Sequence, residues 1–308
     1  MKDFIDIADF TSAQLSSLLE RAITDKALFR AGRLPATCRG KTLALIFEKQ
    51  SLRTRVSFET GMHQLGGSAI CLTNADIGLG MREPTRDVAR VLGRMCDAIT
   101  ARTFAHATVT DLARFSHCPV INALTDYSHP CQAMADVMTA LEMFGPVRGL
   151  KLTFVGDGNN VARSLAMLCV KLGMDFVLTC PMGYELDREF VSALPTGAGL
   201  GSYKVVHDPA EGVIGARIIY TDTWVSMGQE AEKAKRVAAF KDYQVNEALL
   251  GRALKDAIVL HCLPAYRDYE ITDGVMEKYA ASIFGQAENR LHFQRTLLNV
   301  LIAEGGIR

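Results

Sequence analysis

The chain has 308 residues, a length that favours two domains over one. Hydrophobic residues make up 49% of it, enough to form sizeable cores, and 34 basic residues balance 34 acidic ones. With a formal net charge of zero, the chain has no sequence-wide field that attracts nucleic acid or an anionic membrane, so any anion site must be local.

The cysteines and the N-terminal residues indicate the cellular setting. The eight cysteines are scattered and form no Cys-x-x-Cys pair, which favours reduced thiols over a disulfide framework or a zinc site. The N-terminus contains acidic residues and no apolar signal-peptide core, and no apolar run approaches membrane-spanning length. We therefore predict a soluble cytoplasmic protein with no metal, nucleic-acid or membrane partner.

The first elements in chain order are an amphipathic helix over 11–30 and a buried strand over 41–46, followed by a helix that begins at Leu52. Ser51 is the expected N-cap of this helix. The free N–H groups and positive dipole end of a helix favour a phosphate, and Arg53, Arg55 and Thr54 add side-chain donors. The alternative is an ordinary N-cap followed by arginines that face solvent.

The segments up to residue 145 continue the alternation of strands and helices. We predict strands over 68–72, 98–101 and 119–124, helices over 87–95 and from Pro130, and an irregular loop over 74–84. A lone histidine beside a proline more often has a structural role than a catalytic one. However, Ser51, Arg102 and His129 each follow a predicted strand, and ligands of open α/β sheets gather at the carboxyl ends of strands.

A new strand-turn-helix unit begins after 145, with Gly156 and Gly158 in its turn. Val161 occupies the third position of the Gly-x-Gly-x-x-Gly fingerprint, which disfavours a nicotinamide enzyme. The amides of Asn159 and Asn160 could hold a zwitterionic group at the start of the helix, or could simply cap it.

Three further strands are predicted over 176–179, 216–220 and 257–260. Asp222 is the only acid in the loop after the second of these, and the helix that follows, which includes Arg236, is interpreted as a solvated face. Cys262 follows the third strand; an inert buried thiol is its default interpretation, and ligand contact the alternative. A long helix is predicted from Asn289, with Arg290 at its start.

These patterns predict an α/β fold of two doubly wound parallel-sheet domains, with the active site in the cleft between their strand ends. The first domain covers 1–145, and a C-terminal helix over about 288–308 packs back onto it. The second domain covers 146–287.

Four motifs resemble those of the carbamoyltransferases: Ser51-Leu-Arg-Thr-Arg55, His129-Pro-Cys-Gln132, Asp222-Thr-Trp-Val-Ser-Met-Gly228 and His261-Cys-Leu-Pro264. The last two resemble the ornithine branch of that family. The resemblance implies carbamoyl transfer from carbamoyl phosphate to the side-chain amine of L-ornithine, giving citrulline and phosphate in arginine metabolism. It also implies that no cofactor is needed, that the first domain binds carbamoyl phosphate and the second ornithine, and that the protein is a homotrimer or a multiple of trimers.

The resemblance assigns a role to individual positions. The residues expected to bind carbamoyl phosphate are Ser51, Leu52, Arg53, Thr54, Arg102, His129, Gln132, Cys262, Leu263 and Arg290. Those expected to bind ornithine are Leu124, Asn160, Asp222, Ser226 and Met227. Among all of these, the catalytic residues are expected to be Arg102, His129, Asp222 and Cys262.

Two positions depart from the family pattern. Leu52 stands where relatives commonly have Thr, so a phosphate contact there must come from the backbone. Gly78 stands where many relatives have Gln or His in a loop that reaches a neighbouring subunit's site. The alternatives that remain are a carbamoyltransferase for putrescine, an acylated ornithine or aspartate, and a catalytically silent binding paralogue. Aspartate is the least favoured amine, because Asp222 would repel its extra carboxylate.

Overall fold

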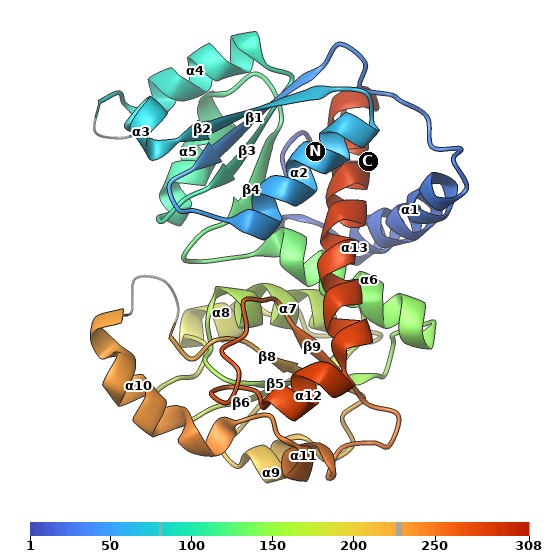
Figure 1. Cartoon of the computed structure of the whole chain (residues 1–308), viewed down its shortest axis with the longest axis vertical. Coiled ribbons are helices and arrows are strands. Elements are labelled where there is room, and N and C mark those ends of the chain that lie inside the picture. The colour runs from blue at the N-terminus through green and yellow to red at the C-terminus, as the bar shows by residue number, and fades with distance from the viewer. Residues whose placement is uncertain (80–81, 226–229, 308) are drawn as a thin grey trace. The chain divides into compact units, whose positions relative to one another are not determined.

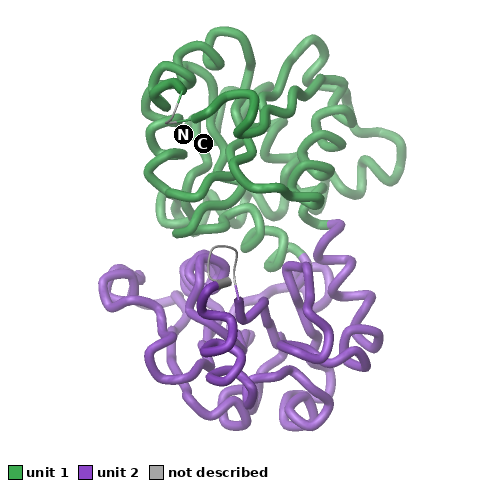
Figure 2. Tube along the Cα trace, turned by 60° about the vertical axis from the view of Figure 1, so that its left-hand side comes forward, with its two compact units in different colours: residues 1–138, 289–308 green, residues 139–288 purple. Residues whose placement is uncertain are grey.

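The computed structural model describes residues 1–79, 82–225 and 230–307, which form two compact units (Figure 2). Unit 1 comprises residues 1–138 and 289–308, and unit 2 comprises residues 139–288. The chain leaves unit 1 within α6 (Pro130–Phe144) and returns to it within α13 (Ala280–Leu298). The predicted boundary at 145 lies just after α6, whereas the division in the structure lies inside that helix.

Unit 1 is built on a parallel sheet whose strand order is β2-β1-β3-β4 (Figure 1). Its strands are β1 (Thr42–Phe47), β2 (Ser68–Thr73), β3 (Ala98–Arg102) and β4 (Val120–Leu124). Its further helices are α1 (Ser12–Arg30), α2 (Leu52–Gln64), α3 (Asn74–Ile77), α4 (Thr85–Met95) and α5 (His106–Phe115). A capping box between Thr11 and Gln14 is present at the start of α1.

Alternation along the central strands of unit 1 divides its apolar residues between two faces. Ala44 and Ile46 of β1 point to the face where α4 and α5 pack, and they share one buried cluster with Val88 and Val109 of those helices. β2 is different, because all of its residues, as expected for an edge strand, are exposed or half-buried. Parallel strands are usually covered on both faces, so the exposure of β2 is unusual for this kind of sheet.

Unit 2 is built on a second parallel sheet, in the order β7-β6-β5-β8-β9. Its strands are β5 (Lys151–Val155), β6 (Asp175–Thr179), β7 (Tyr203–Val206), β8 (Ile218–Thr221) and β9 (Ile258–His261). Its further helices are α7 (Asn160–Lys171), α8 (Arg188–Ala193), α9 (Pro209–Gly212), α10 (Lys233–Phe240), α11 (Glu247–Leu250) and α12 (Asp273–Lys278). The two parallel sheets with their helices confirm the predicted α/β fold class.

Three local predictions were wrong. The loop predicted over 74–84 includes one helical turn, α3, which ends at Gly78 in the left-handed region with φ +59°. The terminal helix, α13, begins at Ala280, so Arg290 lies well inside it rather than at its start. Arg236 is only 6% exposed, although its helix was interpreted as a solvated face. Short or weakly patterned segments such as these take their form from the elements they pack against.

No helix in the described ranges has both the length and the apolarity needed to cross a membrane. All eight cysteines lie in these ranges and carry free thiols.

Candidate active site

The strand order of unit 1 creates a switch point between β1 and β3. The chain runs from β1 outward to β2, and then returns to the other side of β1 to form β3. Phe47 and Arg102 are paired at the carboxyl ends of these two strands. Ligands of open α/β sheets bind beside such a point, where loops leave adjacent strands in opposite directions.

Hydroxyls and guanidinium groups meet at this switch point. Ser51 caps α2 by accepting a hydrogen bond from the backbone N–H of Thr54 at 3.3 Å. Arg102 Nη1 lies 3.3 Å from Ser51 Oγ and 3.4 Å from Thr54 Oγ1, and its side chain is 8% exposed. Arg290 Nη2 donates to the same Thr54 hydroxyl at 3.3 Å. Two buried cations at the N-terminus of a helix form a strongly anion-attracting site.

Arg290 is held in place by amide groups on two helices. Its Nη1 donates to Gln132 Oε1 of α6, and Gln132 Nε2 donates to Asp136 Oδ1 at 2.7 Å. With the amide of Gln294 oriented so that both of its polar atoms are satisfied, its oxygen accepts from Arg290 Nη2 and Nε at 3.0 and 3.1 Å. Most rotamers of the arginine are thereby excluded, so its fork of donors is preorganised.

His129 lies between β4 and α6 and is buried in unit 1. Burial lowers the pKa of His129 well below its ordinary value, and the positive charges of Arg290 and Arg102 lower it further. The imidazole is therefore neutral near pH 7. A neutral imidazole still carries one N–H, so it can donate a hydrogen bond without bringing a third positive charge into the site.

The other predicted residues of unit 1 differ in exposure. The side chain of Leu52 is 74% exposed at the first position of α2, which leaves only its backbone for a ligand. Arg53 follows it and is half-buried. Leu124 ends β4 and is also half-buried. Arg55 was considered as an anion donor, but it is exposed and pairs with Glu59 at 2.9 Å along α2.

Unit 2 has its own switch point, between β5 and β8. Val155 and Thr221 are paired at the carboxyl ends of these strands, and Thr221 is also paired with His261 of β9. The loops that follow contain Asn159, Asp222 and Cys262. Three segments far apart in the sequence are thus brought to one edge of the sheet.

The carboxylate of Asp222 is 8% exposed and receives several hydrogen bonds. Its Oδ1 accepts from the backbone N–H of Thr223 at 2.8 Å and from the thiol of Cys262 at 3.0 Å, and its Oδ2 accepts from Asn159 Nδ2 at 2.8 Å. These three donors fix the direction of the carboxylate. The arrangement presents one oriented negative charge at the edge of the sheet.

A histidine network lies behind Cys262 and Leu263. The backbone N–H of Leu263 donates to His261 Nδ1 at 2.9 Å, so Nε2 carries the proton and donates to Glu270 Oε1 at 3.1 Å. Leu263 has φ +60°, an uncommon conformation for a branched residue. Asp222, His261 and Cys262 have potential ligand atoms within 4.8 Å of one another. Both ring nitrogens of His261 are nevertheless engaged, so we interpret this group as a hydrogen-bonded network.

A largely buried ion pair between Arg236 and Asp157 supports the loops of unit 2, and the sequence did not reveal it. Arg236 Nη1 of α10 lies 2.8 Å from Asp157 Oδ2 and donates to the carbonyl of Trp224 at 3.1 Å. Burial raises the pKa of Asp157, and the charge of Arg236 opposes that rise. No local sequence pattern marks either residue. The two meet only after β5 and β8 have paired.

The predicted ornithine residues are only partly described. Asn160 is the first residue of α7 and is half-buried, whereas the neighbouring Asn159 is the N-cap and contacts Asp222. Ser226 and Met227 lie outside the described residues.

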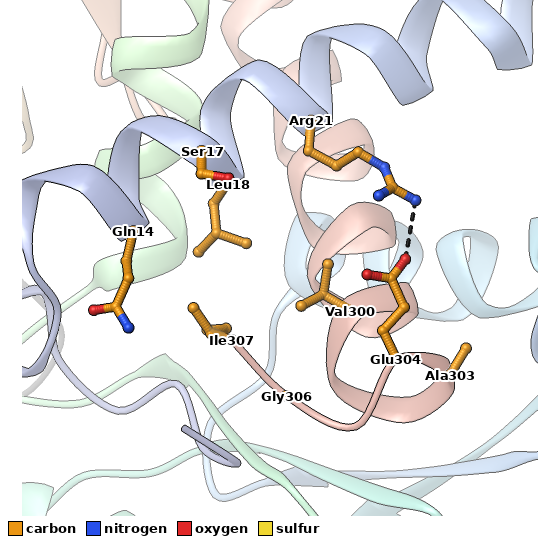
Figure 3. A pocket seen from close by; sticks show the side chains of 9 residues that line it. All are labelled: Gln14, Ser17, Leu18, Arg21, Val300, Ala303, Glu304, Gly306 and Ile307. Carbon is orange, nitrogen blue, oxygen red and sulfur yellow. Dashed lines mark hydrogen bonds and ion pairs between the residues drawn. The ribbon is translucent and has the colours of Figure 1, made fainter.

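A separate pocket of about 600 Å³ lies in unit 1 between α1 and the C-terminal segment (Figure 3). Arg21 and Glu304 point toward each other across it and pair at 3.0 Å. Its lining includes none of the predicted site residues, being formed by Gln14, Ser17, Leu18, Arg21, Val300, Ala303, Glu304, Gly306 and Ile307.

Comparison with known families accounts for nearly the whole chain. Residues 2–142 match the carbamoyl-phosphate binding domain of aspartate/ornithine carbamoyltransferases, and residues 148–301 match the Asp/Orn binding domain of the same enzymes. The chain therefore belongs to the aspartate/ornithine carbamoyltransferase family.

Individual relatives point to one branch of this family. The chain is 47% identical to the ornithine carbamoyltransferase of Methanoculleus marisnigri, over 99% of this chain and 98% of the relative. It is 45% identical to the anabolic ornithine carbamoyltransferase of Pyrococcus furiosus, over 100% and 98% of the two chains. The solved structure of ornithine carbamoyltransferase from Pyrococcus furiosus superimposes with a TM-score of 0.94, covering 99% of this chain and 97% of the other.

Proposed function

We propose that this chain transfers the carbamoyl group of carbamoyl phosphate to the side-chain amine of L-ornithine, giving L-citrulline and phosphate. The observation that carries the proposal is the oriented carboxylate of Asp222, together with its sequence context in the ornithine branch. A single buried negative charge fits the ammonium of an amino acid and repels the second carboxylate of aspartate. Near full-length similarity to enzymes named ornithine carbamoyltransferase supports the same assignment.

The switch point of unit 1 is proposed to bind carbamoyl phosphate. Ser51, Thr54 and Arg53, with the backbone N–H groups at the start of α2, including that of Leu52, bind the phosphate, and Arg102 bridges the phosphate and the carbonyl oxygen. Arg290 and Gln132 orient the carbamoyl group. His129, neutral because its pKa is lowered by burial, donates its N–H to the carbonyl oxygen as negative charge develops there.

The switch point of unit 2 is proposed to bind ornithine. Asp222 pairs with the backbone ammonium, Asn160 contacts the backbone groups, and Ser226 and Met227 contribute from the loop that follows Asp222. Leu124 of unit 1 provides apolar contact. Cys262 and the backbone of Leu263 are proposed to contact the carbamoyl group, with Cys262 coupled to Asp222 through its thiol.

The reaction requires both sets of residues to act on one pair of substrates. Holding the amine at attack distance from the carbonyl carbon makes the reaction effectively unimolecular. Developing negative charge on the carbonyl oxygen is stabilised by Arg102 and His129, and phosphate leaves as the carbon–oxygen bond breaks. The residues above supply every role without a cofactor.

We further propose that the chain forms a homotrimer, or a multiple of trimers, in the cytoplasm and serves arginine biosynthesis. The exposed face of β2 supports the assembly, because Ile70 is 49% exposed on an edge strand of a parallel sheet. The anabolic relative supports the pathway. The zero net charge argues against nucleic-acid partners.

The test is a comparison of amines with the purified protein and carbamoyl phosphate. We expect phosphate and citrulline to appear in equal amounts with ornithine, and little product with putrescine, N-acetylornithine or aspartate. A higher kcat/KM for one of these other amines would assign the protein to another branch. Absence of product with all four would indicate the silent paralogue, which the intact arginine and histidine cluster of unit 1 disfavours.

A further inference from the structure

The contacts of Asn159 reach both a helix and the proposed substrate carboxylate. Its Oδ1 accepts hydrogen bonds from the backbone N–H groups of Val161 and Ala162, both at 3.0 Å. Its Nδ2 donates to Asp222 Oδ2 at 2.8 Å. One amide therefore links the first turn of α7 to the carboxylate at the end of β8.

The helix fixes which atom of this amide faces Asp222. A flipped amide would leave two N–H groups of α7 without their cap and would place an oxygen against a carboxylate. The orientation found is therefore strongly preferred. Most residues of α7 are buried in unit 2, so the helix is held firmly in place. The amide of Asn159, which caps this helix, is therefore rigidly placed as a donor to Asp222.

We infer that Asn159 is a positioning residue for amine selection: it fixes the carboxylate of Asp222 in the direction that receives the substrate ammonium. This inference rests on the proposed function. Thr223 and Cys262 restrain Oδ1, while Asn159 restrains Oδ2, so the plane of the carboxylate is set from both sides. Without Asn159, the carboxylate can rotate about its side-chain bonds and loses a hydrogen bond to its charged form.

The competing explanation is that Asn159 only caps α7. A serine separates the two roles, since its hydroxyl is a good cap but its side chain is too short to reach Asp222 as well. Asn246 provides the matched control, because it caps α11 through the backbone N–H of Leu249 at 2.9 Å and its amide N–H group donates to Gln244. Asn246→Ser thus measures the effect of replacing an asparagine cap by a serine cap elsewhere in the same unit.

The experiment measures five quantities for the parent, Asn159→Ser and Asn246→Ser: melting temperature, affinity for carbamoyl phosphate, affinity for norvaline in the presence of carbamoyl phosphate, and KM and kcat for ornithine. Norvaline carries the backbone ammonium of ornithine but no reactive amine. For Asn159→Ser we expect norvaline affinity to fall and ornithine KM to rise, each by about tenfold or more, as for loss of a hydrogen bond to a charged group. Carbamoyl phosphate affinity should stay within about twofold of the parent.

Asn246→Ser is expected to match the parent in all the binding measurements. If Asn159→Ser also binds norvaline like the parent, the residue is only a cap and the inference is overturned. If the parent itself neither binds norvaline nor uses ornithine, it is the proposed function that fails.

An exchanged pair, Asn159→Asp with Asp222→Asn, gives a second and independent reading. The exchange preserves the hydrogen bond with its polarity reversed, and aspartate is a good N-cap, so the melting temperature should lie near that of the parent. The carboxylate now lies on α7 rather than at the end of β8, and we expect norvaline binding to remain about tenfold or more weaker. Recovery of norvaline binding would show that the position of the charge is unimportant, and would overturn the inference.

Discussion

The proposed choice of amine depends on the environment of Asp222. Its two oxygens are restrained by a backbone N–H, a thiol and an amide. A partly desolvated carboxylate attracts an ammonium more strongly than an exposed one, because fewer water dipoles screen the pair. The proposed preference for ornithine therefore depends on this residue.

Replacing Asp222 with Asn removes the charge while keeping the shape. We expect kcat/KM for ornithine to fall by about a hundredfold or more, with carbamoyl phosphate affinity nearly unchanged. Steady-state kinetics and calorimetric titration measure the two effects. Norvaline affinity should fall in parallel; if only turnover falls, Asp222 handles the attacking amine instead of the backbone ammonium.

Arg53 offers a test of the proposed phosphate site. We expect Arg53→Lys to weaken carbamoyl phosphate binding by about 2 to 3 kcal/mol, because a planar fork of donors is replaced by a point charge. Titration with carbamoyl phosphate measures this directly. An unchanged affinity would place Arg53 on the solvent face of α2. Arg55→Lys, at an exposed arginine of the same helix, is the control and should leave the affinity unchanged.

The lowered pKa of His129 should make the free energy of unfolding depend on pH. Its pKa is lowered in the folded state by burial and by Arg290 and Arg102, so the native protein holds a neutral imidazole that the unfolded chain protonates below about pH 6.5. Its contribution to stability is present above that pH and is lost as the pH falls toward the folded value. The free energy of unfolding in urea, measured at pH 7.5 and 5.0, should fall less on acidification for His129→Asn than for the parent. An equal fall in both proteins would contradict the assignment.

At the scale of elements, the ends of helices carry much of the proposed chemistry. Ser51 begins α2 and Asn159 begins α7, and both lie beside a switch point of their sheet. Arg290 and Arg236 act from inside helices, where no local pattern distinguishes them from solvent-facing residues. Helix starts have sequence signals in their capping residues, whereas the buried faces of weakly amphipathic helices do not.

The end of α3 gives a prediction for Gly78. At φ +59° the backbone of a residue with a side chain is strained, and a Cβ added to Gly78 would lie 2.7 Å from Cβ of Arg82. We expect Gly78→Gln to lower the free energy of unfolding by about 1 to 2 kcal/mol, measured by urea denaturation. Gly78→Asn should lose less, since asparagine tolerates this region better. If the two variants are equally stable, backbone strain does not explain the glycine.

At the scale of the whole molecule, the exposed face of β2 bears on assembly. Ile70 is 49% exposed, and Cys71 beside it is half-buried. An apolar residue on an exposed edge strand is a recognised site of association.

Placing a charge on this strand tests the proposed trimer. We expect Ile70→Lys to dissociate the assembly, because an ammonium buried without a partner costs several kcal/mol. Sedimentation velocity measures the change in mass, with Arg90→Ala on the exposed surface of α4 as the control. A variant that remains trimeric would move the interface away from β2.

The sequence by itself determined the alternation of strands and helices, the two-sheet class and the family. Buried strands are continuous apolar runs, and caps such as Thr11 and Ser51 mark where helices begin, so local physics defines these elements. The motifs also predict the residues of the proposed site. Gly156 and Gly158 do not complete a dinucleotide fingerprint, because Val161 occupies the third glycine position.

Only the tertiary structure decided which of these residues meet. Strand order is not written in local patterns, and it is the pairing of β5 with β8 that places Asn159 against Asp222 and Asp157 against Arg236. In the same way, the pairing of β1 with β3 brings Arg102 to Ser51. Contacts across a switch point join residues about 50 to 80 positions apart, and their energy arises from burial and alignment that exist only after the sheet has formed.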